Sequence, residues 1–107
     1  MSYFLMQCFH LEGMDSARDT HRPAHRDWVQ SGGEGKAIVL VGSAMLDAAG
    51  GASGNFGILE AASEADARAF AEGDPYNRAG IVSRIALTPL PDTFQAHRIG
   101  EPMTPRK

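Results

Sequence analysis

The stretch that decides the fold is Ala37-Ile38-Val39-Leu40-Val41-Gly42-Ser43-Ala44-Met45-Leu46, in the first half of the chain. Its run of β-branched and other apolar residues predicts a strand. Because polar and apolar residues do not alternate in it, we expect a central strand buried on both faces. The small, Gly-rich segment 47–54 predicts a hairpin connection, and residues 55–62 form the returning strand.

A helix and a last strand are expected on the C-terminal side of this hairpin. Ser63 has the side chain of a helix N-cap and Asp66 occupies the capping-box position, which predicts a helix to Glu72 that stops at Gly73. The sequence at 74–77 predicts a turn, and residues 81–88 predict a strand. Beyond Pro89, further prolines and mixed polar residues predict an extended tail with little structure of its own.

A strand and a helix are expected on the N-terminal side. Residues 3–9 are apolar and rich in aromatics, which predicts a buried strand. Apolar residues at helical spacing predict a helix over 17–31, with Ser16 as N-cap and Gly32 and Gly33 as its stop. Pro23 leaves two possibilities open: a second helix starts there, or one helix bends there.

The resulting order, strand–helix–strand–strand–helix–strand, is typical of a ferredoxin-like α+β fold. It predicts an antiparallel sheet with two helices on one face. We expect residues 1–90 to form this domain and residues 91–107 to form the tail. Too few elements remain to cover the other sheet face, so we expect a second subunit's sheet to cover it, which makes the protein a homodimer.

Composition excludes several classes of protein. The chain has 107 residues, 43% of them hydrophobic, with a formal net charge of -3. It has no basic tract, which argues against nucleic acid as a partner, and no apolar run long enough for a membrane span. A single cysteine, Cys8, excludes a disulfide framework and is expected to be a core residue rather than a nucleophile. Without a recognisable signal peptide, the expected location is the cytoplasm.

The residues best suited to chemistry gather in the first quarter of the chain. His21 and His25 are four apart, so an unbroken helix places them on one face. Such a face is either simply solvated, with one histidine against the sheet, or it holds a general base. A histidine that abstracts protons usually has its second nitrogen held by a carboxylate or a carbonyl. Asp74 precedes a proline and could simply bond to the backbone of a turn, but it lies just past the second helix, from where this topology permits a pair with His25.

Two other kinds of site are weighed against this one. His21 and His25, with His10 or Asp74, could form a three-ligand metal site, but Pro23 disturbs the helical register and we expect no functional metal. The Gly-rich segment 50–57 could cradle a phosphate, but such a cradle requires a following helix and here a strand follows.

Taken together, the sequence resembles the YCII-related domain family, or YciI-like proteins, including the DGPF group. The resemblance covers residues 3–89. Its carrying segments are Arg18-x3-Arg22-Pro23-Ala24-His25, Val41-Gly42-Ser43, 54–62, Ser63-Glu64-Ala65-Asp66-Ala67-Arg68, Asp74-Pro75-Tyr76 and Ala79-Gly80-Ile81. It implies a ferredoxin-like fold that dimerises through its sheets as a dimeric α+β barrel. It also implies a His–Asp active site that maps onto His25 and Asp74.

The chain departs from the family pattern at two places. The family often has Gly-Pro where this chain has Gly42-Ser43, so Ser43 is expected to change the polarity of the pocket. The family often ends in Pro-Trp, whereas this chain has Pro89-Leu90 and a longer tail, which is expected to alter the pocket rim.

The function expected from these residues is a small enzyme without a cofactor. His25 and Asp74 would perform acid/base chemistry of the elimination or isomerisation type on a small cyclic or anionic substrate. The family that the sequence resembles includes a dehydrochlorinase of chlorinated hydroxyquinols. The expected substrate-binding residues are Arg18, Arg22, His21, Ser43 and Tyr76, with the arginines holding an anionic oxygen. The alternatives are a non-catalytic dimeric module that binds a small ligand, and a metal-using enzyme.

Overall fold

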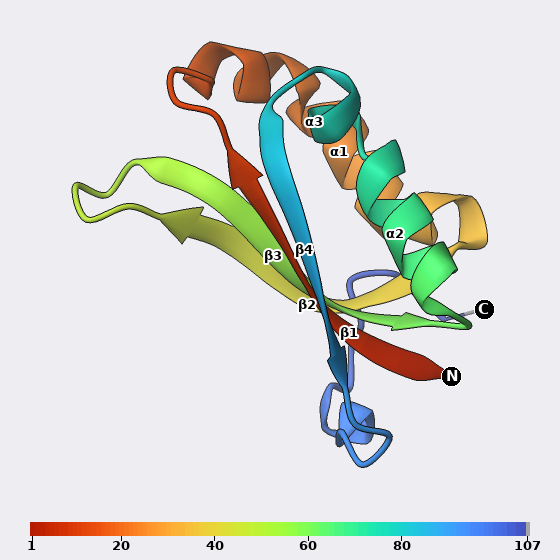
Figure 1. The fold of residues 1–107 in the computed structure, drawn as a ribbon. Helices are drawn as coiled ribbons and strands as arrows, with labels where there is room; N and C mark the ends of the chain where they lie inside the picture. The colour runs from red at the N-terminus through yellow and green to blue at the C-terminus, as the bar shows by residue number, and fades with distance from the viewer. Residues whose placement is uncertain (107) are drawn as a thin grey trace.

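The computed structural model describes residues 1–106, which form one antiparallel sheet with helices on one of its faces (Figure 1). The elements in chain order are β1 (Ser2–His10), α1 (Asp15–Gly35), β2 (Ala37–Leu46), β3 (Ala52–Ala61), α2 (Glu64–Gly73), α3 (Pro75–Arg78), β4 (Val82–Leu90) and the short 3-10 helix η1 (Ala96–Arg98). The strand order is β2-β3-β1-β4, and each neighbouring pair is antiparallel. This arrangement confirms the predicted ferredoxin-like α+β class. None of the helices within residues 1–106 is both long and apolar enough to cross a membrane.

The position of β2 corrects the sequence analysis. β2 is an edge strand, whereas β1 and β3 occupy the centre of the sheet. Only its first half is buried, at Ala37, Val39 and Leu40, while Val41 is 42% and Leu46 is 65% exposed. The second half extends away from the helices as an arm of the β2–β3 hairpin (Figure 1). An apolar β-branched run indicates strand structure, but it does not encode the place of that strand in the sheet.

The first helix differs from the prediction at its N-terminal end, whereas the predicted stop at Gly32 and Gly33 is confirmed. It begins at Asp15 after Met14, so Ser16 is not the N-cap, and it continues through Pro23 without a second start. The helical dihedrals end before Gly32, where three consecutive residues have φ near +60°. Such values favour glycine, and at Gly33 an added Cβ would lie 2.8 Å from the Phe70 ring. The glycines therefore end this helix while keeping it close to α2.

The second helix and the turn after it prepare the site. Ser63 accepts a hydrogen bond from the Asp66 amide at 3.1 Å, as the capping prediction required. The predicted turn at 74–77 is one short helix, α3, whose N-cap is Asp74. The indole of Trp28 donates to the Phe70 carbonyl at 3.0 Å and thereby joins α1 to α2. The buried core beneath these helices contains Phe4, Met6, Cys8, Ala37, Val39, Leu59, Ala61, Ala67, Phe70 and Ala71.

After β4, the described residues 91–106 contain one short 3-10 helix, η1, and they pack against the rest of the fold. Thr104 of this C-terminal tail lies over the seam between α1 and β2 and is only 6% exposed. The Thr104 amide donates to the Val39 carbonyl at 3.1 Å. Its hydroxyl accepts from the Val39 amide at 2.9 Å and donates to the Val29 carbonyl at 2.6 Å. Arg106 then forms a bidentate ion pair with Glu60. The tail covers part of the β2 edge that would otherwise present unpaired backbone groups.

Replacement of Thr104 by valine should destabilise the protein by about 1–3 kcal/mol, because the buried Val39 amide would lose its partner. Valine has the same shape, so the change removes only the hydroxyl. Chemical denaturation of wild type and Thr104→Val measures the difference. Thr20→Val is the matched control, since the Thr20 hydroxyl bonds to its own helix in an exposed position and its loss should have little effect. Equal stability of Thr104→Val and wild type would contradict the tail anchor.

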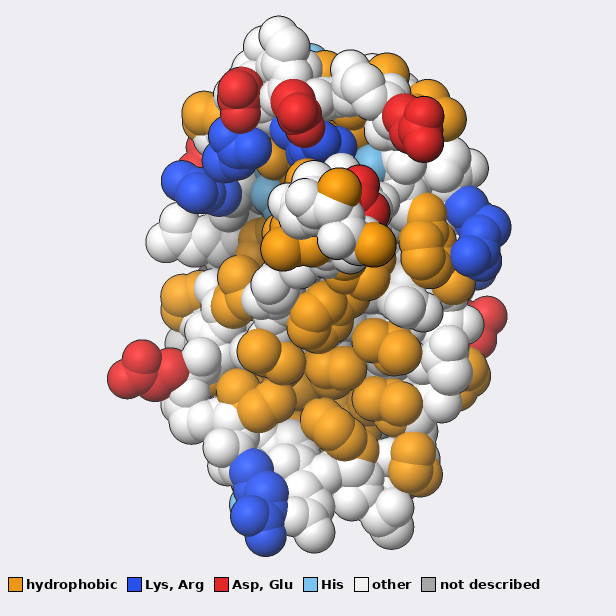
Figure 2. Space-filling model, turned by 90° about the vertical axis from the view of Figure 1, so that its left-hand side faces the viewer, with side chains coloured by type: hydrophobic (Ala, Val, Ile, Leu, Met, Phe, Trp, Pro, Cys, Tyr) orange, Lys and Arg blue, Asp and Glu red, His pale blue; other side chains and the backbone are white. Residues whose placement is uncertain are grey.

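The sheet face opposite the helices is apolar. The strand pairing places Val41, Ile58 and Leu5 side by side across β2, β3 and β1 on this face. Figure 2 shows hydrophobic side chains gathered on it in one continuous area. Phe94 of the tail packs against Tyr3 at one end of this face, with ring centroids 5.4 Å apart. The rest of the face is the large continuous apolar area of Figure 2.

Candidate active site

A cavity of about 560 Å³ lies between the helices and the sheet. This volume is within the range of small-molecule sites. Every layer of the fold contributes to its wall, and the lining residues include Met6, His10, Arg18, Arg22, His25, Val29, Val39, Gly42, Asn55, Gly57, Phe70, Asp74, Tyr76, Met103 and Pro105. His10, Arg18, His25, Asn55, Asp74 and Tyr76 contact one another and form a polar end of the cavity. The rest of the wall is mixed, with Arg26 and Gln30 beside the apolar residues.

Two paired glycines leave room for this cavity. Gly42 of β2 lies opposite Gly57 of β3, and both line the cavity. An added Cβ at Gly42 would lie 2.6 Å from the Phe56 carbonyl oxygen, so a side chain does not fit there. At Gly57 an added Cβ would make only ordinary contacts, the nearest at 3.5 Å from the Met6 side chain. The floor of the cavity is thus bare backbone at this point of the sheet.

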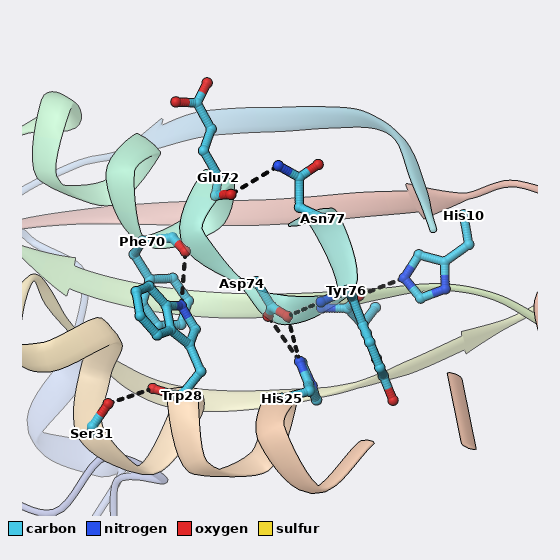
Figure 3. A network of polar contacts seen from close by, with 10 residues as sticks. His10, His25, Trp28, Ser31, Phe70, Glu72, Asp74, Tyr76 and Asn77 are labelled. Carbon is cyan, nitrogen blue, oxygen red and sulfur yellow. Dashed lines mark hydrogen bonds and ion pairs between the residues drawn. The ribbon is translucent and has the colours of Figure 1, made fainter. Parts of the chain in front are cut away.

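His25 and Asp74 form a hydrogen-bonded pair at the polar end (Figure 3). The His25 Nδ1 lies 2.9 Å and 2.8 Å from the two carboxylate oxygens of Asp74. Asp74 also accepts a bond of 2.8 Å from the Tyr76 amide, which is the N-cap contact of α3. The side chain of Asp74 is 7% exposed and that of His25 is 17% exposed. The cap thus fixes the carboxylate before it meets the histidine.

The pair determines which nitrogen of His25 faces the cavity. An ionised carboxylate only accepts hydrogen bonds, so Nδ1 carries the proton and donates it to Asp74. In the neutral ring Nε2 is then the acceptor, and within residues 1–106 it has no hydrogen-bond partner. The Tyr76 ring stacks on the imidazole with centroids 4.1 Å apart and planes 3° from parallel. A carboxylate and a stacked ring hold His25 in the orientation that a general base requires.

A second polar group, centred on His10, lies beside this pair. Its Nδ1 lies 3.2 Å from the Arg18 guanidinium and its Nε2 lies 2.8 Å from Asn55 Oδ1. Arginine only donates, so Nδ1 accepts and the proton of the neutral ring is on Nε2. Arg18 is 6% exposed and pairs with Asp15, and the His10 ring meets Tyr76 edge-on at 5.6 Å. A neutral His10 therefore helps to orient both the Arg18 guanidinium and the Tyr76 ring.

Stability should fall as the pH drops below about 6.5, because folding favours neutral His10. Burial lowers the pKa of His10 below its usual 6.5. The neighbouring Arg18 and His25 lower this pKa further, whereas the hydrogen bond to Asn55 raises it in part. Below 6.5 and above the folded pKa the unfolded chain binds more protons, so the free energy of unfolding rises with pH in that window.

Chemical denaturation between pH 5 and 7.5 measures this dependence for wild type and His10→Gln. Glutamine keeps one acceptor and one donor, so the variant should lose less stability toward acid pH than wild type. The Arg106 hydrogen bond holds the pKa of Glu60 below its usual 4.5, so that carboxylate contributes in full above pH 4.5 and does not confuse the result. Parallel curves for the two proteins would show that His10 is not the group responsible.

The structure separates some of the predicted site residues from the cavity. His21 lines a different, shallower depression together with Trp28 and Gly73, so it does not join His25. Ser43 reaches the cavity lining, but its cross-strand partner is Phe56, so its side chain belongs to the face away from the helices. Its hydroxyl bonds to the Ala44 carbonyl. Arg22 lies at the cavity mouth, 38% exposed and paired with Asp19.

Sequence reasoning missed the role of several residues in this cavity. The sequence indicates His10 only as a possible metal ligand and Asn55 only as part of a hairpin. Within residues 1–106 no three His, Cys, Asp or Glu side chains lie close enough together to hold a metal ion. Cys8 is a buried core residue, as expected, and burial raises the pKa of its thiol to about 12. It is therefore unreactive at neutral pH.

Comparison with known proteins identifies the family. Residues 1–91 match the profile of the YCII-related domain. The chain belongs to the YCII-related domain family. No curated protein matches the chain significantly. A solved structure with the same fold is 5-chloro-2-hydroxyhydroquinone dehydrochlorinase from Burkholderia phenoliruptrix AC1100, in complex with 2,5-dihydroxybenzoquinone. It is 24% identical, with a TM-score of 0.72, and the match covers 83% of this chain and 93% of that chain.

Membership of the YCII-related family confirms the resemblance drawn from the sequence. The matched residues, 1–91, end just after β4. Met103 and Pro105, the tail residues that line the cavity, follow the matched segment.

Proposed function

We propose that this YCII-related protein is a small enzyme that uses His25 and Asp74 for acid/base elimination or isomerisation of a small cyclic, anionic compound. The observation that carries the proposal is the orientation of His25. Its Nδ1 is held by a buried carboxylate, while its Nε2 has no partner within residues 1–106 and faces a cavity of small-molecule size. A side chain placed only for stability would have no need of a free acceptor nitrogen at a cavity wall.

The other polar side chains of the cavity suit an anionic ring. Arg18 and Arg22 are on the same face of α1 as His25, so their guanidinium groups would hold an anionic oxygen while His25 works on the adjacent atom. Tyr76 backs the imidazole and the glycine floor leaves room for a flat ring. In an elimination, His25 Nε2 takes a proton, the electrons of the broken bond form a new π bond, and the leaving anion departs with its own pair. Such a step is balanced without an oxidant or a reductant, so we propose no cofactor.

The solved relative supports the substrate class. It is a dehydrochlorinase of a chlorinated hydroxyhydroquinone and was solved with a dihydroxybenzoquinone. The test is therefore chloride release from 5-chloro-2-hydroxyhydroquinone, together with binding of 2,5-dihydroxybenzoquinone by calorimetry. Chloride release above the rate without protein, lost in the His25 variant, would support the enzyme. Binding of the quinone without turnover of this or related halogenated phenols would favour the non-catalytic ligand-binding module instead.

We also propose that a second copy of the chain covers the open sheet face, because an apolar area of this extent is rarely left in water. Sedimentation at micromolar concentration should give about twice the 11.4 kDa mass of one chain. Ile58→Lys, in the middle of that face, should shift the protein to the monomer, whereas Glu12→Lys in an exposed loop should not. A wild-type chain that sediments as a monomer would overturn the dimer.

A further inference from the structure

We infer that Met103, held in place by Thr104, closes the apolar side of the cavity and limits the size of the ring substituents that the site accepts. The inference rests on the proposed function, since it concerns the ligand of the same cavity. It assigns a specificity role to a segment that follows residues 1–91, the part of the chain that the family profile matches.

The tail passes close to His25. Val29 is four residues after His25 on α1, so both side chains lie on one face of the helix, about one turn of 5.4 Å apart. Thr104 bonds to the Val29 carbonyl on one side and to the Val39 amide on the other. The tail therefore crosses the seam between α1 and β2 one helical turn away from the candidate base.

The hydrogen bonds of Thr104 place its two neighbours in the cavity wall. Met103 and Pro105 flank Thr104, and both line the cavity, next to Val29 and Val39. The Met103 amide is directed to the Leu40 carbonyl at 3.4 Å, which fixes the backbone on this side of the anchor. Thr104 is buried whereas Met103 is 46% exposed, so the anchor is rigid while the methionine forms the changeable part of the wall.

A bound ring would span the polar and the apolar side chains of the cavity. The polar groups His10, Arg18 and His25 are suited to hold the oxygens of an anionic ring. A ring held there would direct its opposite edge toward the apolar wall of Val29, Val39 and Met103. An apolar substituent on that edge would contact Met103, which lines the cavity and is far more exposed than Val39. The side chain of Met103 therefore sets how large the substituent can be.

The binding test compares two probes, 2,5-dihydroxybenzoquinone and its 3-butyl derivative, on wild type and Met103→Ala. We expect Met103→Ala to bind the butyl compound about tenfold more tightly than wild type does, which equals the burial of roughly two further methylene groups. Affinity for the unsubstituted ring should change less than about threefold, which is within the usual variation between variants whose changed residue does not contact the ligand. Leu11→Ala is the matched control, because Leu11 is also 46% exposed and does not line the cavity.

A second measurement does not depend on the ligand. Gly57→Cys places a thiol on the cavity floor, where an added Cβ makes only ordinary contacts. Labelling with N-ethylmaleimide and with the bulkier N-pyrenylmaleimide then measures access, and the wild type, whose only cysteine is the buried Cys8, gives the background. Adding Met103→Ala should raise the ratio of the bulky to the small reagent severalfold, and adding Leu11→Ala should leave it unchanged.

The outcomes separate this inference from the proposed function. If the unsubstituted quinone binds but Met103→Ala changes neither the butyl affinity nor the labelling ratio, the role of Met103 is overturned and the proposed function stands. If neither quinone binds any of the proteins, the proposed substrate class is wrong, and the labelling ratio alone decides whether Met103 closes the cavity.

Discussion

Replacement of His25 by alanine should lower the turnover of a substrate by about 10²–10⁴, the usual loss when a general base is removed. The expected substrate for the assay is 5-chloro-2-hydroxyhydroquinone, followed by chloride release. The loss should be largest in kcat, because the imidazole accepts the proton in the transition state of the reaction. Substrate binding should change less, because the arginines and the glycine floor remain to bind the ring.

The fold should survive this change. Asp74 keeps its bond from the Tyr76 amide, so the carboxylate is not left without a partner. Removal of a ring that is partly open to the cavity costs less than removal of a core side chain. We therefore expect a melting temperature close to that of wild type, and partial recovery of activity when imidazole is added to the buffer.

His21→Ala is the matched control for this experiment. His21 is one helical turn before His25 on the same helix, but it lines the other depression. Its removal should leave turnover unchanged. Full activity of His25→Ala, or equal losses in the two variants, would remove the case for an acid/base enzyme and leave the ligand-binding module as the better interpretation.

The local signals in the sequence predicted most elements of the fold, because they depend on neighbouring residues. Ser63 and Asp66 are three apart, and their cap forms as expected. The edge position of β2 could not be predicted in this way, since Val39 and Val41 have the same strand preference in the centre of a sheet and at its edge. The position of the tail could not be predicted either, because it depends on the contact of Thr104 with Val39, which are 65 residues apart in the sequence.

The candidate site shows the same difference between local signals, which the sequence carries, and long-range contacts, which it does not. The spacing of His21 and His25 suggested a shared face, but the structure places the two rings at different depressions. The contact of His25 with Asp74 was expected from the topology and the family resemblance together, whereas neither predicted the contact of His10 with Asn55. That contact follows from the β1–β3 register, which pairs Cys8 with Asn55 and brings the amide to the end of β1. Register is a property of the assembled sheet rather than of either strand.

Replacement of Asp74 by asparagine should lower kcat by a similar factor, about 10²–10⁴, while the fold stays intact. Asparagine has the same shape, and its carbonyl oxygen is able to keep the bond from the Tyr76 amide. Its NH2 group then faces His25 Nδ1 as a donor. The imidazole must accept there, so its proton moves to Nε2, the nitrogen that faces the cavity. A ring with Nε2 protonated cannot take a proton from the substrate, which is the effect of the same replacement in the Ser-His-Asp triad.

Three measurements test this expectation together. Nitrogen NMR of the His25 ring should report Nδ1–H in wild type and Nε2–H in Asp74→Asn, which a purely structural role of the aspartate would not predict. Denaturation should give nearly equal stabilities, and chloride release should fall while binding of 2,5-dihydroxybenzoquinone changes little. Asp27→Asn, an exposed change on the same helix as His25, is the control and should alter none of these. If Asp74→Asn keeps its turnover, or unfolds far more readily than wild type, the pair holds α1 to α3 and does not serve as an acid/base dyad.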